Sequence, residues 1–313
     1  MPSAKAKVGV VADAQRGNWV DRYAPDWLKP YARLARWDRP IGFWLLFWPC
    51  GYALALAALA VPGRGFNWIA LVEMFVGAIA MRGAGCTLND IVDAGLDAKV
   101  TRTRSRPIPS GQVSKRQAAV FLVLQLVVAA AIVATFNLVT IGLAVLSLLL
   151  VAIYPFMKRI TWWPQFFLGL AFSWGALVGW TSQLGTLSLP PLLLYVGCIF
   201  WVIGYDTIYA LQDIEDDALA GIKSTARLFG ENVKLAVAGF YILAVIFWLV
   251  AAAMAGDVSV FVMVLIVPAG LLAWQVLTLE PKDPRNALRM FKANNWVGLT
   301  LTAAMLLEVV IHS

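Results

Sequence analysis

From Ile41 onward the chain alternates between long apolar runs and short polar segments. Runs such as VFLVLQLVVAAAIVA are continuously apolar and approach the roughly 20 residues that a helix needs to cross a hydrocarbon core. The interruptions, for example PGRGFN and QLGTLSLPP, are short and rich in turn-forming residues. This pattern predicts nine membrane-spanning helices, centred near Leu54, Val76, Val127, Leu146, Leu170, Phe200, Leu243, Leu265 and Met305.

The predicted fold class is all-α, a polytopic membrane protein with nine transmembrane helices around a central cavity. A membrane barrel would show short segments of alternating polarity, which these runs are not. The composition agrees, because 61% of the 313 residues are hydrophobic and only 14% are charged. We expect residues 1–40 to form a cytoplasmic or interfacial segment and residues 41–313 to form the transmembrane domain.

The positive charges are distributed unevenly between the loops. Of 25 lysines and arginines, all but Arg64 and Arg82 lie in residues 1–40 or in alternate loops. Since cations collect on the cytoplasmic side, the N-terminus is predicted to be cytoplasmic. This topology explains the net charge of +7 without nucleic acid, which we do not expect as a partner.

The N-terminal segment gives an expectation for localisation. It has no short apolar core of the kind found in signal peptides, and Asp13, Asp21 and Asp26 make it too acidic for a mitochondrial presequence. We therefore expect a bacterial inner (cytoplasmic) membrane, with the active site toward the cytoplasm.

Few residue types are available for chemistry. The three cysteines, Cys50, Cys86 and Cys198, lie in apolar runs without metal-ligand spacing, and the only histidine is His312. Histidine-based acid–base catalysis and histidine-rich metal sites are excluded on these grounds. Carboxylates, amides, tyrosines and cations must carry any reaction.

Eight of the 18 acidic residues fall into two clusters at the ends of the second and sixth predicted spans. In the first cluster, Asn89, Asp93 and Asp97 are spaced i, i+4, i+8 and share one helical face with Asp90. In the second, Asp213 and Asp217 repeat the i, i+4 spacing, and Asp206 precedes them by two turns. Four spans separate the clusters, so both are predicted to lie on one side of the membrane.

Carboxylates clustered near lipid repel one another unless cations neutralise them. Oxygen ligands that include an asparagine amide suit a hard cation, and Mg²⁺ is favoured if phosphate oxygens complete its coordination. The alternative is a set of solvated ion pairs with neighbouring arginines, each contributing about 0 to 1 kcal/mol. Basic residues near each cluster, Arg106 in RPIPSG and Lys223 in GIKSTARLFG, suit a diphosphate.

These residues resemble the intramembrane aromatic prenyltransferases of the UbiA superfamily, and most closely its 4-hydroxybenzoate polyprenyltransferases. The resemblance covers RLARWDRPIGFWLLFWP, MRGAGCTLNDIVDAGLDAKVTRTRSRPIPSG, YPFMKR and YDTIYALQDIEDDALAGIKSTARLFG. It implies Mg²⁺-dependent transfer of a polyprenyl group from polyprenyl diphosphate to carbon 3 of 4-hydroxybenzoate, in ubiquinone biosynthesis. Membrane lipid would surround the polyprenyl chain.

The resemblance and the residue chemistry together give a set of candidate site residues. The predicted metal ligands are Asn89, Asp90, Asp93, Asp97, Asp213 and Asp217, and the predicted catalytic residues are Asp93, Asp206 and Asp213. Candidate diphosphate contacts are Lys158, Arg159, Lys223 and Arg106. Candidate contacts for the aromatic substrate are Arg82, Arg39, Tyr209 and Tyr154. Structural or interfacial roles stay open for Asp206, Arg39 and the tyrosines.

Two alternative functions remain at this point. One is a prenyltransferase of the same kind with another aromatic acceptor. The other is a phosphate or diphosphate transporter that uses the same pocket of acids and cations. The second is disfavoured because Arg64 and Asp257 are nearly the only ionic residues on the opposite side, which leaves no visible exit path.

Overall fold

A computed structural model describes residues 17–99, 103–214, 218 and 221–312. Within these residues the chain forms helices joined by loops, without strands, as predicted. The α-helices are α1 (Trp19–Tyr23), α2 (Lys29–Leu34), α3 (Ile41–Ala60), α4 (Trp68–Asp97), α5 (Lys115–Val133), α6 (Leu138–Ile160), α7 (Pro164–Ser173), α8 (Gly175–Leu184), α9 (Leu189–Ala210), α11 (Thr225–Phe229), α12 (Val233–Ala255), α13 (Ser259–Val264), α14 (Ile266–Thr278) and α15 (Pro284–His312). Short 3₁₀ helices, η1 (Leu211–Asp213) and η2 (Gly230–Asn232), complete the list.

Eight of the nine predicted span centres lie within helices of this list, and the ninth, Leu265, lies between α13 and α14. Among the described residues, eight helical segments are long and apolar enough to cross a membrane: 41–60, 68–97, 115–133, 138–160, 189–213, 225–255, 259–278 and 284–312. Apolar side chains are exposed along several of them, as on α5 at Val120, Val123 and Val127, which suits contact with lipid tails. The chain is therefore a multi-pass membrane protein, although the count of nine and the orientation of the N-terminus stay predictions.

The fifth predicted span is divided into α7 and α8, and the eighth is likewise divided at Leu265 into α13 and α14. At Trp174 the backbone stays in the right-handed helical region, and Leu177 donates a tighter i to i−3 hydrogen bond to the Trp174 carbonyl at 3.0 Å. Directly after this joint, a side chain at Gly175 would lie 2.6 Å from Cys50 Sγ, and one at Gly179 would lie 2.8 Å from the Cys50 carbonyl. Small residues four apart thus allow α8 to approach α3 closely.

The structure divides into two compact units, each built from separate parts of the chain. The first unit comprises residues 1–44 and 75–134, and the second comprises residues 45–74 and 135–313. The predicted boundary between residues 40 and 41 follows polarity and stays a prediction.

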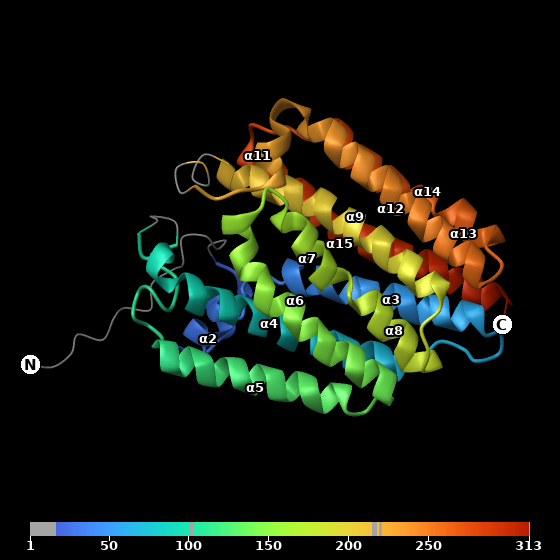
Figure 1. The fold of residues 1–313 in the computed structure, drawn as a ribbon, viewed down its shortest axis with the longest axis horizontal. Coiled ribbons are helices and arrows are strands. Elements are labelled where there is room, and N and C mark those ends of the chain that lie inside the picture. Colours follow the sequence, from blue (N-terminus) through green and yellow to red (C-terminus); the bar gives the residue numbers. More distant parts are fainter. Residues whose placement is uncertain (1–16, 100–102, 215–217, 219–220, 313) are drawn as a thin grey trace, which may run out of the picture. The chain divides into compact units, whose positions relative to one another are not determined.

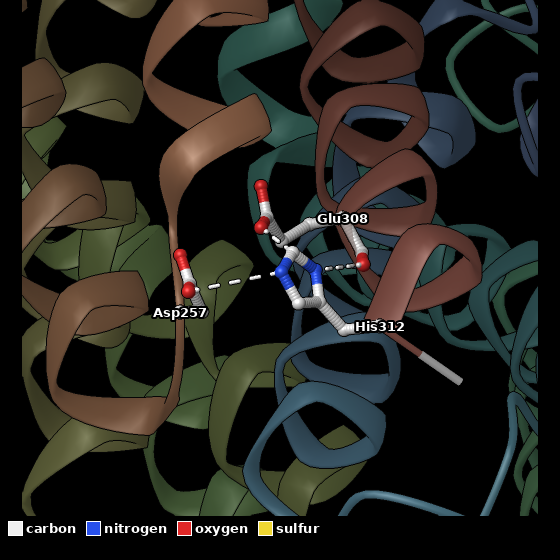
Figure 2. A group of neighbouring side chains, drawn as sticks. All are labelled: Asp257, Glu308 and His312. Carbon is white, nitrogen blue, oxygen red and sulfur yellow. Dashed lines mark hydrogen bonds and ion pairs between the residues drawn. The ribbon is translucent and has the colours of Figure 1, made fainter.

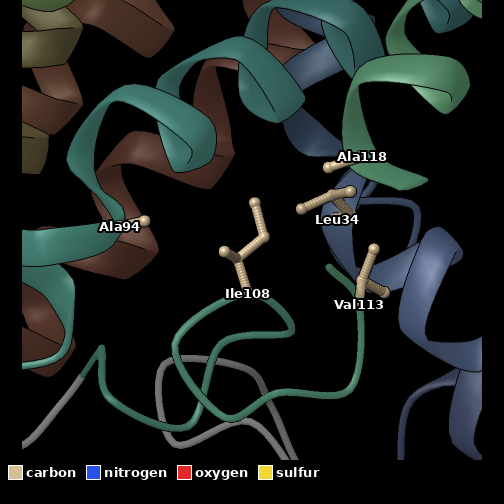
Figure 3. Close-up of a cluster of buried hydrophobic side chains, with 5 residues drawn as sticks. All are labelled: Leu34, Ala94, Ile108, Val113 and Ala118. Carbon is tan, nitrogen blue, oxygen red and sulfur yellow. The ribbon is translucent and has the colours of Figure 1, made fainter. Parts of the chain in front are cut away.

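The first unit has a small apolar core beneath the loop that follows α4 (Figure 3). Leu34 of α2, Ala94 of α4, Ile108 and Val113 of the loop, and Ala118 of α5 are all buried there. The loop after Thr103 is therefore anchored by its own apolar side chains, and its arginines are held near the end of α4.

The second unit is organised around α9, which packs along α12 and also contacts α7 and α15 (Figure 1). The closest approaches are at glycines, because Gly197 faces Trp248 and Gly204 faces Tyr241. These two pairs run in opposite directions along the chain, so α9 and α12 are antiparallel. A buried polar chain joins the same helices to α14 and α15: Trp201 donates to Asn294 at 2.8 Å, and Asn294 and Tyr241 donate to Gln275 at 2.9 Å and 3.0 Å.

Candidate functional site

The first acidic cluster forms the last turns of α4, as its spacing predicted. Asp90, Asp93 and Asp97 are 0%, 1% and 6% exposed, whereas Asn89 is half-buried. Three carboxylates that have lost their water in this way need positive charge or hydrogen-bond donors to stay ionised. The described structure supplies part of that charge with arginines.

Asp90 is held by two arginines of the first unit. Arg36 Nη2 lies 2.7 Å from Asp90 Oδ1, and Arg106 Nη1 lies 3.4 Å from the same oxygen. Arg106 Nη1 also lies 3.0 Å from Asp97 Oδ2, so this arginine bridges two carboxylates of the cluster. Oδ1 of Asp90 therefore faces two guanidinium groups, whereas Oδ2 of Asp90 is buried without a hydrogen-bond partner among the described residues.

Arg36 was not among the predicted site residues. Its side chain is buried, it donates to the Arg33 carbonyl at 2.8 Å, and its φ of +60° makes it the only non-glycine residue with positive φ among the described residues. A bulky residue in this left-handed conformation is strained and persists only where its contacts compensate. A basic residue at position 36 was visible in the sequence, but its contact with Asp90, 54 residues away, was not.

Further contacts fix the position of α4 relative to α5 and to the loop that follows α4. Thr87 donates to the Gly83 carbonyl at 2.8 Å and accepts a hydrogen bond from Gln125 Nε2 of α5 at 3.2 Å. A side chain at Gly83 would collide with Gln125, since its Cβ would lie 1.9 Å from Oε1. The loop adds a third contact, because Thr103 Oγ1 donates to the Asp97 carbonyl at 3.0 Å.

The two arginines predicted to contact the aromatic substrate have different surroundings. Arg39 lies beside Asp38, with Nε and Nη2 at 3.3 Å and 3.2 Å from its two carboxylate oxygens. Arg82 is half-buried on α4, and its guanidinium packs directly against the backbone of Gly42, where a Cβ would lie 2.4 Å from Nε. Only glycine at position 42 leaves room for this arrangement.

Gly42→Ala is therefore expected to displace Arg82. If Arg82 contacts the acceptor, KM for the acceptor rises about tenfold or more, while KM for the prenyl donor changes little. Steady-state kinetics with each substrate varied in turn measures the two values. Gly142→Ala in α6 is the matched control, because a Cβ there meets no atom within 4 Å. Equal acceptor KM values in both variants would contradict the assignment.

The second acidic cluster is described only in part. Asp206 lies near the end of α9 and Asp213 ends η1, and both are half-buried. Asp217 lies outside the described residues. Because a 3₁₀ helix has about 3.0 residues per turn rather than 3.6, Asp213 is rotated from the position that a continued α-helix would give it relative to Asp206.

Tyr209 lies between these aspartates on α9 and packs on Phe291 of α15, with ring centroids 4.5 Å apart. Tyr205, one turn earlier, packs edge-on against the same ring at 5.8 Å. The aromatic wall beside Asp206 and Asp213 is thus built from α9 and α15. Phe291 was not among the predicted residues, because nothing in the local sequence distinguishes it from other apolar positions.

The predicted cations of the second unit are partly brought together. The backbone N–H of Lys223 donates to the Lys158 carbonyl at 2.9 Å, and its Nζ donates to the Ile160 carbonyl at 3.1 Å. Arg159 is exposed beside Lys158, and Tyr154 is half-buried one turn earlier on α6. YPFMKR and GIKSTA, more than 60 residues apart, are therefore adjacent in the folded second unit.

The segment after Lys223 is tied to the helices beneath it. The backbone N–H of Thr225 donates to Gln165 Oε1 at 3.0 Å, and the Thr225 hydroxyl lies 2.7 Å from that of Thr207. All three side chains are buried. This fixes the start of α11 against α7 and α9, and with it the position of Lys223.

The donor atoms of the first cluster fit Mg²⁺. They are amide and carboxylate oxygens on one helical face, without an imidazole or thiolate, and hard cations prefer oxygen ligands. Asn89, Asp90, Asp93 and Asp97 each offer a carbonyl or carboxylate oxygen that would hold the ion, and for Asp90 this oxygen is Oδ2, because Oδ1 faces Arg36.

A helical membrane fold with oxygen-rich acidic motifs and adjacent cations defines a class of intramembrane enzymes that handle phosphorylated lipids. Residues 46–297 match the UbiA prenyltransferase family. The chain belongs to this family and is a prenyltransferase.

Curated relatives are similar over most of their length. The mitochondrial 4-hydroxybenzoate polyprenyltransferase of Arabidopsis thaliana is 42% identical over 300 residues, which are 96% of this chain and 73% of the relative. The mitochondrial 4-hydroxybenzoate polyprenyltransferase of Bos taurus is 44% identical, and the alignment covers 91% of this chain and 76% of the relative. The 4-hydroxybenzoate geranyltransferase 1 of Lithospermum erythrorhizon is 39% identical, and the alignment covers 93% of this chain and 94% of the relative.

Solved structures show the same fold. An apo UbiA homologue from Aeropyrum pernix K1 has a TM-score of 0.69 at 24% identity, with 84% of this chain and 97% of the homologue covered. A UbiA homologue from Archaeoglobus fulgidus bound to GPP and Mg²⁺ has a TM-score of 0.64 at 18% identity, with 90% and 99% covered. These likenesses concern the helical architecture alone.

Proposed function

We propose that this protein transfers a polyprenyl group from polyprenyl diphosphate to carbon 3 of 4-hydroxybenzoate in a Mg²⁺-dependent reaction of ubiquinone biosynthesis. The main support for this proposal is sequence similarity. Over nine-tenths of the chain, about two residues in five are identical to those of relatives named for this acceptor. The oxygen-rich motif of α4 and the cations of the second unit suit a diphosphate donor.

Each group of residues has a proposed role. Asn89, Asp90, Asp93 and Asp97, with Asp213 and Asp217, bind Mg²⁺, which when bound stabilises the negative charge of the diphosphate leaving group. Lys158, Arg159, Lys223 and Arg106 contact the diphosphate oxygens. The pairing of the two acidic clusters in one reaction stays a prediction from the sequence.

The remaining residues act on the acceptor. Asp206 orients the phenol or accepts a proton, and Tyr209, held against Phe291, offers a ring face beside it. Arg82, with its guanidinium against Gly42, and Arg39 are the proposed partners of the benzoate carboxylate. Asp90 Oδ1 also serves as the anchor of Arg36 and Arg106, which holds the end of α4 in place.

We further propose that the protein works in a bacterial cytoplasmic membrane, with the acidic motifs toward the cytoplasm. The bias of cations toward alternate loops supports this orientation. The relatives named above as mitochondrial are eukaryotic proteins, so localisation of a tagged chain in fractionated cells tests this point.

An acceptor panel tests the proposed function. Purified protein in lipid vesicles receives one polyprenyl diphosphate, Mg²⁺ and one acceptor: 4-hydroxybenzoate, benzoate or 1,4-dihydroxy-2-naphthoate. We expect product only with 4-hydroxybenzoate, substituted ortho to the hydroxyl, and no product after chelation of Mg²⁺. Preference for the naphthoate would replace the acceptor assignment, and product formation in chelator would remove the metal from the proposal.

A further inference from the structure

The only histidine of the chain lies between two carboxylates at the end of α15 (Figure 2). His312 Nε2 is 3.7 Å from Asp257 Oδ2, and His312 Nδ1 is 3.1 Å from Glu308 Oε1. Asp257 belongs to the link between α12 and α13, and Glu308 lies one turn before His312. One ligand atom from each of the three residues falls within 4.8 Å of the other two.

Each carboxylate uses one oxygen to hold the start of α13 and turns the other toward the imidazole. Asp257 Oδ1 accepts from the Ser259 backbone N–H at 2.9 Å, and Glu308 Oε2 accepts from the Phe261 backbone N–H. The remaining oxygens are Asp257 Oδ2 and Glu308 Oε1. Both carboxylates are therefore oriented by backbone donors in the way that outer-shell hydrogen bonds orient metal ligands.

The Glu308 oxygen that faces the imidazole, Oε1, is buried away from solvent. The side chain is 0% exposed, and Oε1 is buried without a hydrogen bond among the described residues. Asp257 supplies the second carboxylate, whose Oδ2 lies on the Nε2 side of the ring at 3.7 Å. Two carboxylates facing one imidazole require a positive charge near the ring.

A protonated histidine would supply that charge to Glu308 Oε1, which lies 3.1 Å from Nδ1, but it leaves Asp257 too far from Nε2 for a hydrogen bond. An N–H to oxygen hydrogen bond spans about 2.7 to 3.2 Å, and the separation between Nε2 and Asp257 Oδ2 is 3.7 Å. Nδ1 lies 3.1 Å from the Glu308 backbone carbonyl, a partner that favours the proton on Nδ1. Nε2 would then direct its lone pair at a carboxylate oxygen, which is unfavourable without a cation between them.

We propose that Asp257, Glu308 and His312 bind a divalent transition-metal ion, for which Zn²⁺ is the best fit. Ligand bonds of about 2.0 to 2.2 Å in a tetrahedron place neighbouring donor atoms about 3.4 Å apart, close to the separation of Nε2 and Asp257 Oδ2. An imidazole nitrogen with two carboxylate oxygens is a borderline donor set that suits Zn²⁺ better than Mg²⁺. Three protein ligands leave a fourth position for water.

The surroundings provide access to this position. Asp257 and His312 are 60% and 36% exposed, and a hollow of about 20 Å³ lined by Leu59, Pro62, Gly63, Val309 and His312 borders the ring. A cavity of that size holds about one water molecule. The proposed ion can therefore reach the site from solvent while Glu308 stays buried.

The site is separate from the acidic residues of the second unit. Asp213 follows the C-terminal end of α9, whereas Asp257 follows the C-terminal end of α12, which runs antiparallel to α9. The two positions thus lie at opposite ends of this helix pair (Figure 1). A metal at Asp257 would join the α12–α13 link to α15 and stabilise that end of the unit without taking part in prenyl transfer.

Zinc binding to the untagged full-length protein in detergent tests the proposal. Equilibrium dialysis is carried out with excess Mg²⁺, so that oxygen sites elsewhere are saturated. We expect the wild type to bind one more Zn²⁺ per chain than His312→Gln. Asp257→Asn is expected to weaken the zinc affinity more than about tenfold, since even outer-shell changes cost about 10- to 100-fold.

The matched control is Asp283→Asn. Asp283 accepts a hydrogen bond from the backbone N–H of Arg285 at 2.8 Å, as Asp257 does from Ser259, and therefore repeats its local geometry. This variant should bind zinc like the wild type. Equal stoichiometry and affinity in the wild type and His312→Gln would overturn the proposal and leave His312 as an ion-pair clamp.

A second measurement uses the wild type alone and so does not depend on folding of a variant. Diethyl pyrocarbonate acylates imidazole, and His312 is the single histidine of the chain. Saturating Zn²⁺ should slow this acylation more than about tenfold, whereas Mg²⁺ should not. An unchanged acylation rate in Zn²⁺ would also overturn the proposal.

Discussion

Replacing Asp93 with asparagine is expected to lower prenyl transfer by at least about a hundredfold while the protein still folds. Asp93 is 1% exposed at the centre of the α4 motif, one helical turn from both Asn89 and Asp97. Asparagine keeps its shape but removes a charge and a metal-binding oxygen. Losing one such stabilising group from a water-poor site costs about 10²- to 10³-fold in turnover.

The measurement is the initial rate of prenylation as a function of Mg²⁺ concentration. Asp93→Asn should show both a lower maximal rate and a higher Mg²⁺ requirement, and Asp213→Asn should behave similarly. Glu231→Gln is the control, because Glu231 is an exposed acid of the same unit as Asp213 that has no proposed role. Wild-type rates for Asp93→Asn at every Mg²⁺ concentration would remove Asp93 from the metal site.

The membrane-spanning architecture could be predicted because it depends on local properties of the chain. Apolar length alone placed the span centres, and the 3.6-residue period correctly placed Asn89, Asp93 and Asp97 along one face of α4. The break at Trp174 escaped prediction, since both sides of it are equally apolar. It lies next to the close approach of Gly175 to Cys50, which is a tertiary contact.

Pairings between distant residues were harder to predict than helices. Cations near the acidic cluster were visible, and Arg106 does contact Asp90 and Asp97. Arg36 was hidden among eight basic residues of the N-terminal segment, which topology alone explained. Similarly, a single histidine indicated no metal site until folding brought Asp257 beside it. Charge composition limits the chemistry, but only the tertiary structure selects the partners.

The buried pair of Arg36 and Asp90 yields the second large effect, which concerns stability. Their side chains are 9% and 0% exposed, and the contact distance is 2.7 Å. Removing one member of a buried ion pair leaves the other charge unpaired and costs about 3 to 5 kcal/mol. We therefore expect Asp90→Asn to lower the free energy of unfolding by about that amount, measured by denaturant unfolding in detergent micelles.

The matched control is Asp26→Asn, because Asp26 pairs with Lys29 at a similar distance of 2.8 Å but is 81% exposed. That variant should unfold like the wild type, since solvent screens exposed pairs. If both variants lowered the free energy of unfolding by the same amount, burial would not be what makes the Arg36–Asp90 pair stabilising.

Two substitutions at Arg36 separate its charge from its backbone strain. Both Arg36→Gly and Arg36→Ala remove the guanidinium, but only glycine adopts the observed φ of +60° without cost. Arg36→Ala should therefore be less stable than Arg36→Gly by about 1 to 3 kcal/mol, the usual cost of a strained left-handed residue. Equal stabilities would show that the chain relaxes at position 36 once the ion pair is gone. The contacts of Arg36 with Asp90 and the Arg33 carbonyl would then be what imposes the left-handed conformation, and the end of α4 would be held by charge rather than by the local backbone.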